Sequence, residues 1–289
     1  MTATDMDSKH LTCLVTGATS GIGEATAMGL ARRGATVVMV GRNAERGQRV
    51  RDHIISSTGN SSVELMLVDF ASLAQVRDLA AEFTARHTHL HRLVNNAGVV
   101  KLRRETSIDG YETMFAVNHL AHFLLTHLLL DTIVASPAAR IVNVSSHAHH
   151  FGWLESDDWQ SEKRYSAMRS YGGSKLANVL FTYELARRLE GTGVTANCLH
   201  PGGVASRLGQ DNGWVGKIAT SAFRPFALSP EKGARTSLHV TLSPELDGVT
   251  GHYFAGSRER NSSKRSHDRD LASALWRDSE RMVGISQEA

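Results

Sequence analysis

Short apolar runs alternate with longer amphipathic stretches along most of the 289-residue chain. The runs are rich in Val, Ile and Leu without polar alternation, which is typical of strands covered on both faces. They span residues 11–16, 36–40, 63–68, 92–94, 140–144, 194–199 and 251–254. The amphipathic stretches predict helices over residues 23–33, 44–57, 73–87, 111–133, 171–190 and 230–242. Because strand and helix alternate strictly, the pattern predicts one doubly wound α/β domain, with a parallel sheet of about seven strands and helices on both faces.

Two segments interrupt this alternation, at residues 147–170 and 202–229. Both follow a predicted strand, so both should leave the carboxyl edge of the sheet, where ligands bind in open α/β sheets. Connections of this length are usually functional or disordered, and their aromatic residues favour ordered walls of a substrate pocket. These aromatics are Phe151, Trp153, Trp159, Trp214, Phe223 and Phe226. The alternative is that each of them only fills a small local core.

The rest of the chain predicts a single domain over residues 1–289, with an N-terminal tail at 1–10 and a C-terminal extension at 257–289. No run approaches 18 apolar residues, and residues 1–9 lack the basic and apolar regions of a signal peptide. We therefore expect a cytoplasmic protein without a membrane partner. The formal net charge of +3 is too small to indicate a nucleic-acid partner. Cys13 and Cys198 lie in predicted strands and are expected to be buried core residues, not a disulfide.

A glycine-rich turn, Gly17-x-x-x-Gly21-x-Gly23, joins the first predicted strand to the first predicted helix. Gly17 permits a tight turn, Gly21 lets a phosphate approach the backbone, and Gly23 lets helix and strand pack closely. The helix that follows would direct free N–H groups and its positive dipole end at a pyrophosphate. The pattern predicts a dinucleotide site in a Rossmann-type domain, to which Thr19, Ser20 and Ile22 of the same turn belong.

The end of the second strand is where the choice of cofactor can be predicted. An acidic residue there would accept from the ribose 2′-hydroxyl of NAD, whereas this chain has Arg42 followed by Asn43. An arginine can pair with a 2′-phosphate, so we expect NADP(H) to be preferred over NAD(H). The alternative is a surface arginine at the start of a helix.

Two further strand ends offer contacts to the same cofactor. Asp69 and Phe70 end the third strand, and the Asp69 carboxylate could accept from the adenine amino group or could cap the next helix. The fourth strand ends in small and amide residues, which suit a backbone running beneath the cofactor. These are Asn96, Ala97 and Gly98.

Tyr171 and Lys175 are the candidate proton donor and its activating cation. They are four residues apart, so on a helix they share a face. An isolated tyrosine has a pKa of about 10, and a nearby ammonium should lower that pKa by stabilising the phenolate. Two other pairs have the same spacing, Tyr165 with Arg169 and Tyr183 with Arg187. We favour Tyr171, because it lies where the predicted helix begins, whereas Tyr165 lies in a loop and Tyr183 deep within the helix.

Hydroxyl and amide groups complete the candidate site. Ser145 and Ser146 end the strand at 140–144, where a hydroxyl could bind both a substrate oxygen and the Tyr171 phenol or could only cap the strand. Asn118 is an amide in an apolar setting and needs partners; it could hold neighbouring backbone or a water that feeds protons to Lys175.

A metal site and a hydrolytic site are both disfavoured. The three histidines at 147, 149 and 150 lack a carboxylate or cysteine at suitable spacing, so no metal is expected. No Gly-x-Ser-x-Gly is present, which leaves an α/β hydrolase without support.

Together these motifs resemble the short-chain dehydrogenase/reductase family of the classical type. The matching positions are 16–23, 95–98, Asn118, Ser146, Tyr171 with Lys175, and Pro201-Gly202, in the order of the family. The resemblance implies that Ser146 is the catalytic serine and Tyr171 the general acid/base. It also implies that Lys175 holds the nicotinamide ribose and that Asn118 supports a proton-relay water. The segment against the nicotinamide would include Pro201, Gly202, Val204 and Ser206.

A narrower resemblance is to the retinol-dehydrogenase-like branch, through residues 140–146, 162–165 and 174–181. That branch often prefers NADP(H) and tends to have a long spacing between serine and tyrosine, as between Ser146 and Tyr171. The family resemblance implies a homodimer or homotetramer built through the helices at 111–133 and 171–190. The leading hypothesis is hydride transfer between NADP(H) and a ketone, an aldehyde or the corresponding alcohol of a fairly apolar small molecule. Two alternatives are a carbon–carbon double-bond reductase similar to protochlorophyllide reductase, and a non-catalytic NADP(H) sensor.

Overall fold

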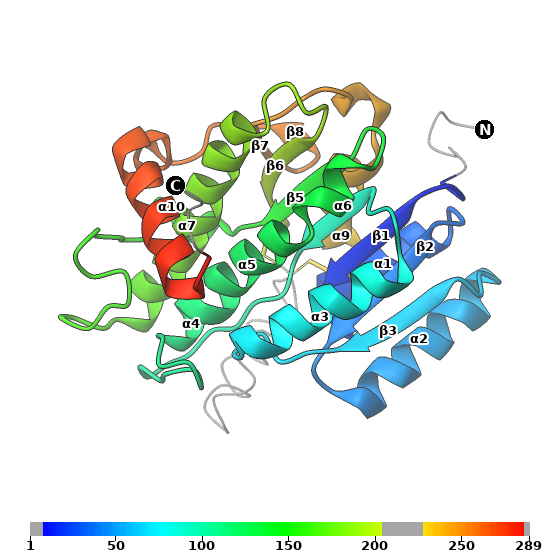
Figure 1. The fold of residues 1–289 in the computed structure, drawn as a ribbon, viewed down its shortest axis with the longest axis horizontal. Helices are drawn as coiled ribbons and strands as arrows, with labels where there is room; N and C mark the ends of the chain where they lie inside the picture. Colours follow the sequence, from blue (N-terminus) through cyan, green and yellow to red (C-terminus); the bar gives the residue numbers. More distant parts are fainter. Residues whose placement is uncertain (1–7, 204–227, 286–289) are drawn as a thin grey trace.

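A computed structural model describes residues 8–203 and 228–285 (Figure 1). Several predicted site residues lie outside these ranges, namely Val204, Ser206, Trp214, Phe223 and Phe226. Within the described ranges, no helix has the length and apolar character needed to cross a membrane.

The centre of the molecule is one eight-stranded sheet with the order β3-β2-β1-β4-β5-β6-β7-β8. The strands are β1 Thr12–Thr16, β2 Thr36–Gly41, β3 Val63–Leu67, β4 Arg92–Asn95, β5 Arg140–Val144, β6 Thr195–His200, β7 Tyr253–Ala255 and β8 Arg258–Glu259. All neighbours are parallel except β7 and β8. The predicted parallel sheet is therefore confirmed, and the added strand is the two-residue β8, which is too short to leave a periodic signal.

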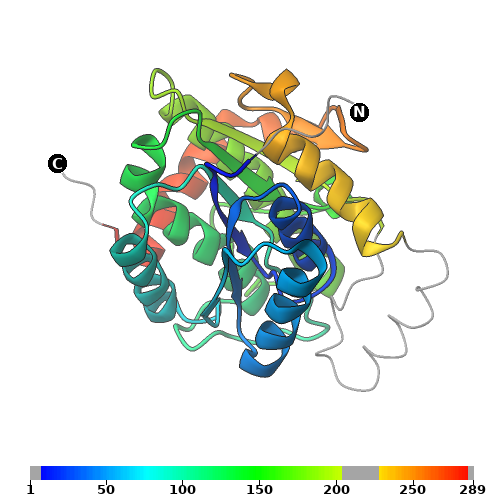
Figure 2. The same cartoon turned by 90° about the vertical axis from the view of Figure 1, so that its right-hand side faces the viewer.

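Helices cover both faces of the sheet, as predicted (Figure 2). One face carries α1 Gly21–Ala31, α2 Ala44–Thr58 and α9 Pro230–Leu242, and the other carries α3 Leu73–Arg86, α5 Ala121–Leu128 and α7 Ala167–Arg188. Each layer encloses its own apolar core. The strand order reverses at β1, which pairs with β2 on one side and β4 on the other. Ligands of open α/β sheets bind outside the carboxyl ends of the strands at such a switch point.

The helix predicted over residues 111–133 is not continuous. It consists of α4 Thr113–Phe115, a π-helical turn over Ala116–Leu120, then α5 and α6 Leu130–Val134. The π turn contains Asn118, and single π turns inside helices often occur at functional sites. The apolar periodicity of this stretch did not predict the π turn.

The position of Tyr171 also needs correction. The helix predicted to begin at this residue, α7, begins at Ala167. Tyr171 is therefore about one turn inside the helix, not at its entry.

The C-terminal extension contains a helix that the sequence analysis missed, α10 Arg269–Val283. Asp268 caps its first turn by accepting from the Leu271 amide at 3.0 Å, and Gly284 ends it with a φ of 66°. The ring of Trp276 lies 5.0 Å from that of Phe123 on α5 and 5.8 Å from that of Phe181 on α7. Helix α10 thus lies across α5 and α7 (Figure 1), and an oligomer formed through this side would involve α10 as well. The oligomeric state stays a prediction.

Replacing Trp276 with alanine should destabilise the domain by about 3–5 kcal/mol, because it leaves a cavity between three helices. Only 4% of this side chain is exposed, and its indole N–H donates to Glu280 at 2.6 Å. Urea unfolding of Trp276→Ala would measure the loss, with exposed Arg277→Ala on the same helix as the control. An equal, small effect of both substitutions would show that α10 is not packed as described.

Candidate active site

Four predicted residues meet at the carboxyl edge of the sheet. Ser146 is the second residue after β5, Tyr171 and Lys175 lie on α7, and Asn118 lies in the π turn. Ser146 lies beside Tyr171 and lowers the pKa of its phenol, and it accepts from the Ala148 amide at 3.2 Å. The neighbouring Ser145 is buried and donates to the Lys175 carbonyl at 2.8 Å. Ser146 is thus the serine that meets the tyrosine, and Ser145 ties the strand end to α7.

Two glycines between Tyr171 and Lys175 let the segment after Ser146 pack directly on the helix. A Cβ at Gly172 would lie 2.6 Å from the Ala148 carbonyl oxygen and 2.8 Å from the Cα of Gly152. A Cβ at Gly173 would lie 2.7 Å from the Trp153 carbonyl oxygen. Any side chain at these positions would push the segment away from α7. The distance between Ser146 and Tyr171 therefore depends on this backbone contact.

Lys175 is almost fully buried, with 4% of its side chain exposed. Its Nζ donates to the Val144 carbonyl at 3.1 Å and lies 6.0 Å from the centre of the Tyr171 ring. Burial lowers the pKa of Lys175 to about 8. Burial also raises the pKa of Tyr171. The neighbouring Ser146 lowers this pKa, but its effect is smaller than that of burial. The expected lowering of the Tyr171 pKa by Lys175 is thus not observed in this structure.

Asn118 holds neighbouring backbone, one of the two roles that the sequence left open. Its Oδ1 accepts from the Val99 amide at 2.8 Å, and its Nδ2 donates to the Val99 carbonyl at 3.1 Å and to the Ser174 hydroxyl at 2.9 Å. Ser174 in turn donates to the Tyr171 carbonyl at 2.8 Å. Asn118 therefore fixes the end of β4 relative to the helix that carries Tyr171. Its role in supporting a water stays a prediction.

The glycine-rich turn has the backbone that its sequence predicts. Gly17 and Gly21 have φ values of 65° and 59°, which other residues rarely adopt. A Cβ at Gly23 would lie 2.3 Å from the Gly17 carbonyl oxygen, so helix and turn pack too closely for a side chain. Ser20 precedes α1 and makes no side-chain cap. The first amides of α1 are therefore not capped by this serine, which suits a helix that would bind phosphate.

The ends of β1 and β4 are joined by one hydroxyl group. Thr16 Oγ1 accepts from the amides of Asn96 and Ala97 at 2.8 and 2.9 Å, and Asn96 Nδ2 donates to the Thr16 carbonyl at 2.7 Å. A Cβ at Gly98 would lie 3.3 Å from Asn118 Oδ1 and 3.4 Å from the Nζ of Lys175. Asn96, Ala97 and Gly98 thus lie beside both the glycine-rich turn and the Tyr/Lys helix, and their contact with a cofactor stays a prediction.

Arg42 and Asn43, the two residues after β2, differ in what their side chains do. Arg42 is exposed at the end of the strand, where a 2′-phosphate is expected. Asn43 accepts from the Arg46 amide at 2.8 Å and caps α2, so its side chain has a structural task.

The structure after β3 rules out one of the two roles that the sequence left open for Asp69. Asp69 accepts from the Ala71 amide at 3.0 Å, and the cap of α3 is Ser72, which accepts from Gln75. The alternative role of Asp69 as the helix cap was therefore wrong. Phe70 is buried with its ring 5.4 Å from that of His122, so only its backbone faces the edge of the sheet.

The three histidines after Ser146 form a short 3₁₀ turn, His147–His150. His149 is buried, and its Nδ1 lies 2.7 Å from the Ser146 carbonyl oxygen while its Nε2 accepts from the Ser263 amide at 3.0 Å. Burial lowers its pKa to about 4. The described part of the chain contains no group of histidine, cysteine or acidic residues suited to a metal ion. His149 thus connects Ser146 to the C-terminal extension, a contact that only the folded structure shows.

The aromatics of the segment 147–170 separate into two groups. Phe151 and Trp153 are 48% and 52% exposed. Trp159 is buried, and its indole N–H donates to Asp278 of α10 at 2.7 Å. It therefore fills a local core, which was the alternative to a pocket wall.

The residue Gly202, after β6, has a φ of 87°, and its amide donates to His200 Nδ1 at 3.0 Å.

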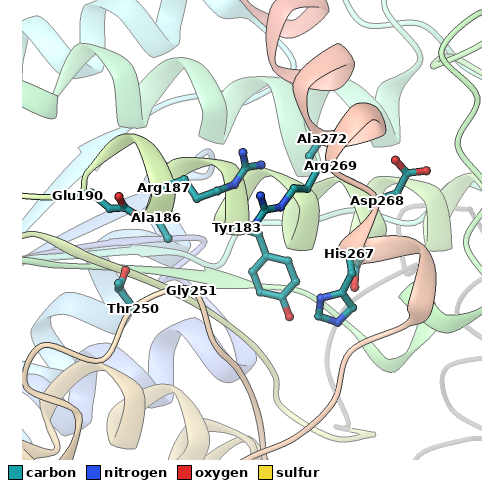
Figure 3. A pocket seen from close by; sticks show the side chains of 11 residues that line it. Tyr183, Ala186, Arg187, Glu190, Thr250, Gly251, His267, Asp268, Arg269 and Ala272 are labelled. Carbon is teal, nitrogen blue, oxygen red and sulfur yellow. The ribbon is translucent and has the colours of Figure 1, made fainter.

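The rival tyrosines point elsewhere. Tyr165 donates to the Lys101 carbonyl at 2.8 Å, and Tyr183 shares a hydrogen bond with Ser262 at 2.7 Å. Tyr183 and Arg187 line a cavity of about 250 Å³ between the end of α7 and the start of α10 (Figure 3). Tyr183 is twelve residues beyond Tyr171, about 18 Å along the helix. This cavity is therefore separate from the site around Ser146.

Comparison with known proteins gives a consistent result. The model of the short chain dehydrogenase family matches residues 11–213. Retinol dehydrogenase 12 from Mus musculus is 43% identical over 275 residues, which cover 95% of this chain and 87% of that protein. A putative uncharacterized protein from Mycobacterium paratuberculosis has a similar crystal structure, with a TM-score of 0.78, 32% identity and coverage of 98% and 97% of the two chains. A putative short chain dehydrogenase from Escherichia coli CFT073 complexed with NADPH gives a TM-score of 0.71, 25% identity and coverage of 88% and 99%.

Gly172→Ala tests the contact between α7 and the segment after Ser146. Alanine in place of glycine normally stabilises a helix by about 1 kcal/mol, but here the new Cβ would overlap backbone, so we expect a loss of about 1–3 kcal/mol. Thermal unfolding would measure it, with Arg169→Ala, an exposed position of the same helix, as control. A stabilised Gly172→Ala variant would contradict the described packing.

Proposed function

Since the chain belongs to the short-chain dehydrogenase family and is an oxidoreductase acting on CH–OH or C=O groups, we propose that it is NADP(H)-dependent and uses Tyr171 as general acid/base. The substrate we propose is a ketone, an aldehyde or the corresponding alcohol of a fairly apolar small molecule. The observation that carries the proposal is the meeting of Ser146, Tyr171, Lys175 and Asn118 beside the glycine-rich turn.

The residues at the switch point fit a dinucleotide. Gly17 and Gly23 hold the turn close to α1, and Gly98 leaves open backbone beside Lys175. The amides at the start of α1 would bind the pyrophosphate, and Lys175 would bind the nicotinamide ribose. When bound, the nicotinamide supplies or accepts the hydride at the substrate carbon.

Tyr171 would exchange the proton at the substrate oxygen. A phenol whose pKa is raised by burial stays protonated at neutral pH, so it can donate to an alkoxide that develops during reduction. The Ser146 hydroxyl, which lies beside Tyr171, can bind the same substrate oxygen. Lys175, with a pKa of about 8, remains largely protonated at pH 7 and places a positive charge next to the site.

The preference for NADP(H) rests on Arg42. It is exposed directly after β2, where the 2′-position of the adenosine ribose is expected. The Escherichia coli relative in complex with NADPH supports this choice.

The apolar substrate class rests on the segment that follows Ser146. Phe151 and Trp153 are exposed there. Gly152, between them, packs against Gly172 of α7, the residue after Tyr171. The retinol dehydrogenase name of the mouse relative supports an apolar alcohol or aldehyde.

Tyr171→Phe should abolish turnover while leaving NADPH binding within about twofold, because only the proton donor is removed. The turnover rate should fall by about 10²–10⁴-fold, which is the usual contribution of a general acid/base. Turnover on a panel of carbonyl compounds and fluorescence titration of NADPH would measure the two effects. Tyr183→Phe is the matched control, since this rival faces another cavity. Turnover of Tyr171→Phe at the wild-type rate would exclude Tyr171 as the acid/base.

Arg42→Asp should weaken NADPH binding by about tenfold or more and leave NADH binding unchanged or improved. The arginine would lose its pairing with the 2′-phosphate, and the aspartate would repel that phosphate. Arg49→Asp makes the same charge change at an exposed position of α2 and serves as control. Unchanged NADPH affinity in Arg42→Asp would contradict the proposed preference.

A further inference from the structure

His122 connects the cofactor side of the site to the π turn. It is the second residue of α5, with 2% of its side chain exposed. Its Nε2 lies 3.0 Å from the hydroxyl of Thr16, at the end of β1. Its Nδ1 lies 3.2 Å from the main-chain carbonyl oxygen of Asn118. The two ring nitrogens therefore contact two segments that are distant in sequence.

The hydrogen bonds determine which nitrogen carries the proton. The Asn118 carbonyl can only accept, so Nδ1 must donate to it. The Thr16 hydroxyl already accepts from the amides of Asn96 and Ala97, which occupies both lone pairs. It must donate its own proton, and Nε2 at 3.0 Å is nearer than the Val94 carbonyl at 3.4 Å. His122 is therefore neutral with the proton on Nδ1.

Protonation would break this arrangement. A proton on Nε2 would face a hydroxyl oxygen that has no free lone pair. Burial, together with a smaller effect of the Lys175 charge, lowers the pKa of His122 to about 3. The neutral form thus persists across the physiological pH range.

We propose that His122 is a positioning residue that couples the cofactor-binding strand ends to the Asn118 turn. Through Nε2 it orients the Thr16 hydroxyl, which holds Asn96 and Ala97 beneath the expected cofactor. Through Nδ1 it fixes the backbone of Asn118, whose side chain holds Val99 and Ser174 beside Tyr171. The inference rests on the proposed function, because it assigns a task within the same site.

Because each nitrogen has one partner, the two tasks can be separated. An asparagine amide can take the place of Nδ1 but is too short to reach Thr16, so His122→Asn keeps the bond to Asn118 only. A glutamine amide can reach the position of Nε2, so His122→Gln keeps an acceptor for Thr16 only.

The test compares these two variants in NADPH affinity and in kcat at saturating NADPH with the best substrate of a carbonyl panel. His122→Asn should raise the Kd for NADPH about three- to tenfold with kcat nearly unchanged. His122→Gln should lower kcat about three- to tenfold with Kd nearly unchanged. His53→Gln, an exposed position on α2, is the control for loss of an imidazole.

Amide hydrogen exchange gives a readout that does not need turnover. His122→Asn should speed exchange at Asn96 and Ala97, and His122→Gln should speed it at Val99, whose amide donates to Asn118. If the wild-type protein reduces no carbonyl, the proposed function fails, and the exchange pattern still decides the role of His122.

Proportional changes of Kd and kcat in both variants, with faster exchange at all three amides, would show a general packing role and overturn the inference. Unchanged values in both variants would overturn it as well. Should His122→Asn fail to fold, Thr16→Val removes the same hydroxyl from the other side and should raise Kd while sparing kcat. Equal loss of both in that variant would again contradict a separable role.

Discussion

The hydroxyl of Thr16, at the end of β1, joins the segments of the carboxyl edge on which the site depends. It accepts hydrogen bonds from the amides of Asn96 and Ala97, which follow β4, and it lies 3.0 Å from Nε2 of His122 on α5. Because this buried hydroxyl accepts from both amides, it must donate its own proton, and His122 Nε2 is a nearer acceptor than the Val94 carbonyl at 3.4 Å. The glycine-rich turn, the strand that would run beneath the cofactor and the π turn with Asn118 are thereby placed relative to one another.

A second constraint brings the chemical groups to that edge. The backbone after Ser146 lies against the backbone of α7 at Gly172 and Gly173, with no space for a side chain. This contact sets the distance between the serine and the tyrosine more firmly than side-chain packing could, since backbone cannot change rotamer. His149 supports it from the other side, through the Ser146 carbonyl and the Ser263 amide. Ser263 of the C-terminal extension is thereby tied to the segment after Ser146.

Sequence alone predicted the parallel sheet, for a local reason. It also singled out Ser146, Tyr171 and Lys175, which lie together at the carboxyl edge of that sheet, and their roles in catalysis stay predictions. Strand and helix patterns repeat over short windows. The glycine-rich turn and Ser146 follow strands, and the Tyr/Lys pair lies in the first half of α7. What it missed depends on partners far along the chain. The contact of Asn118 is with Val99, and the contacts of His122 and His149 are with Thr16 and Ser263. Helix α10 did leave a signal, since its buried positions at 272, 275, 276, 279 and 283 have helical spacing.

The most direct test of the account follows the hydride itself. The protein would be incubated with NADPH that carries deuterium at the transferable position of the nicotinamide and with a panel of apolar aldehydes and ketones, and the products would be analysed by mass spectrometry. The account predicts one deuterium on the carbinol carbon of the alcohol formed. Deuterium on a former alkene carbon, or bound NADPH that is never consumed with any compound, would contradict it.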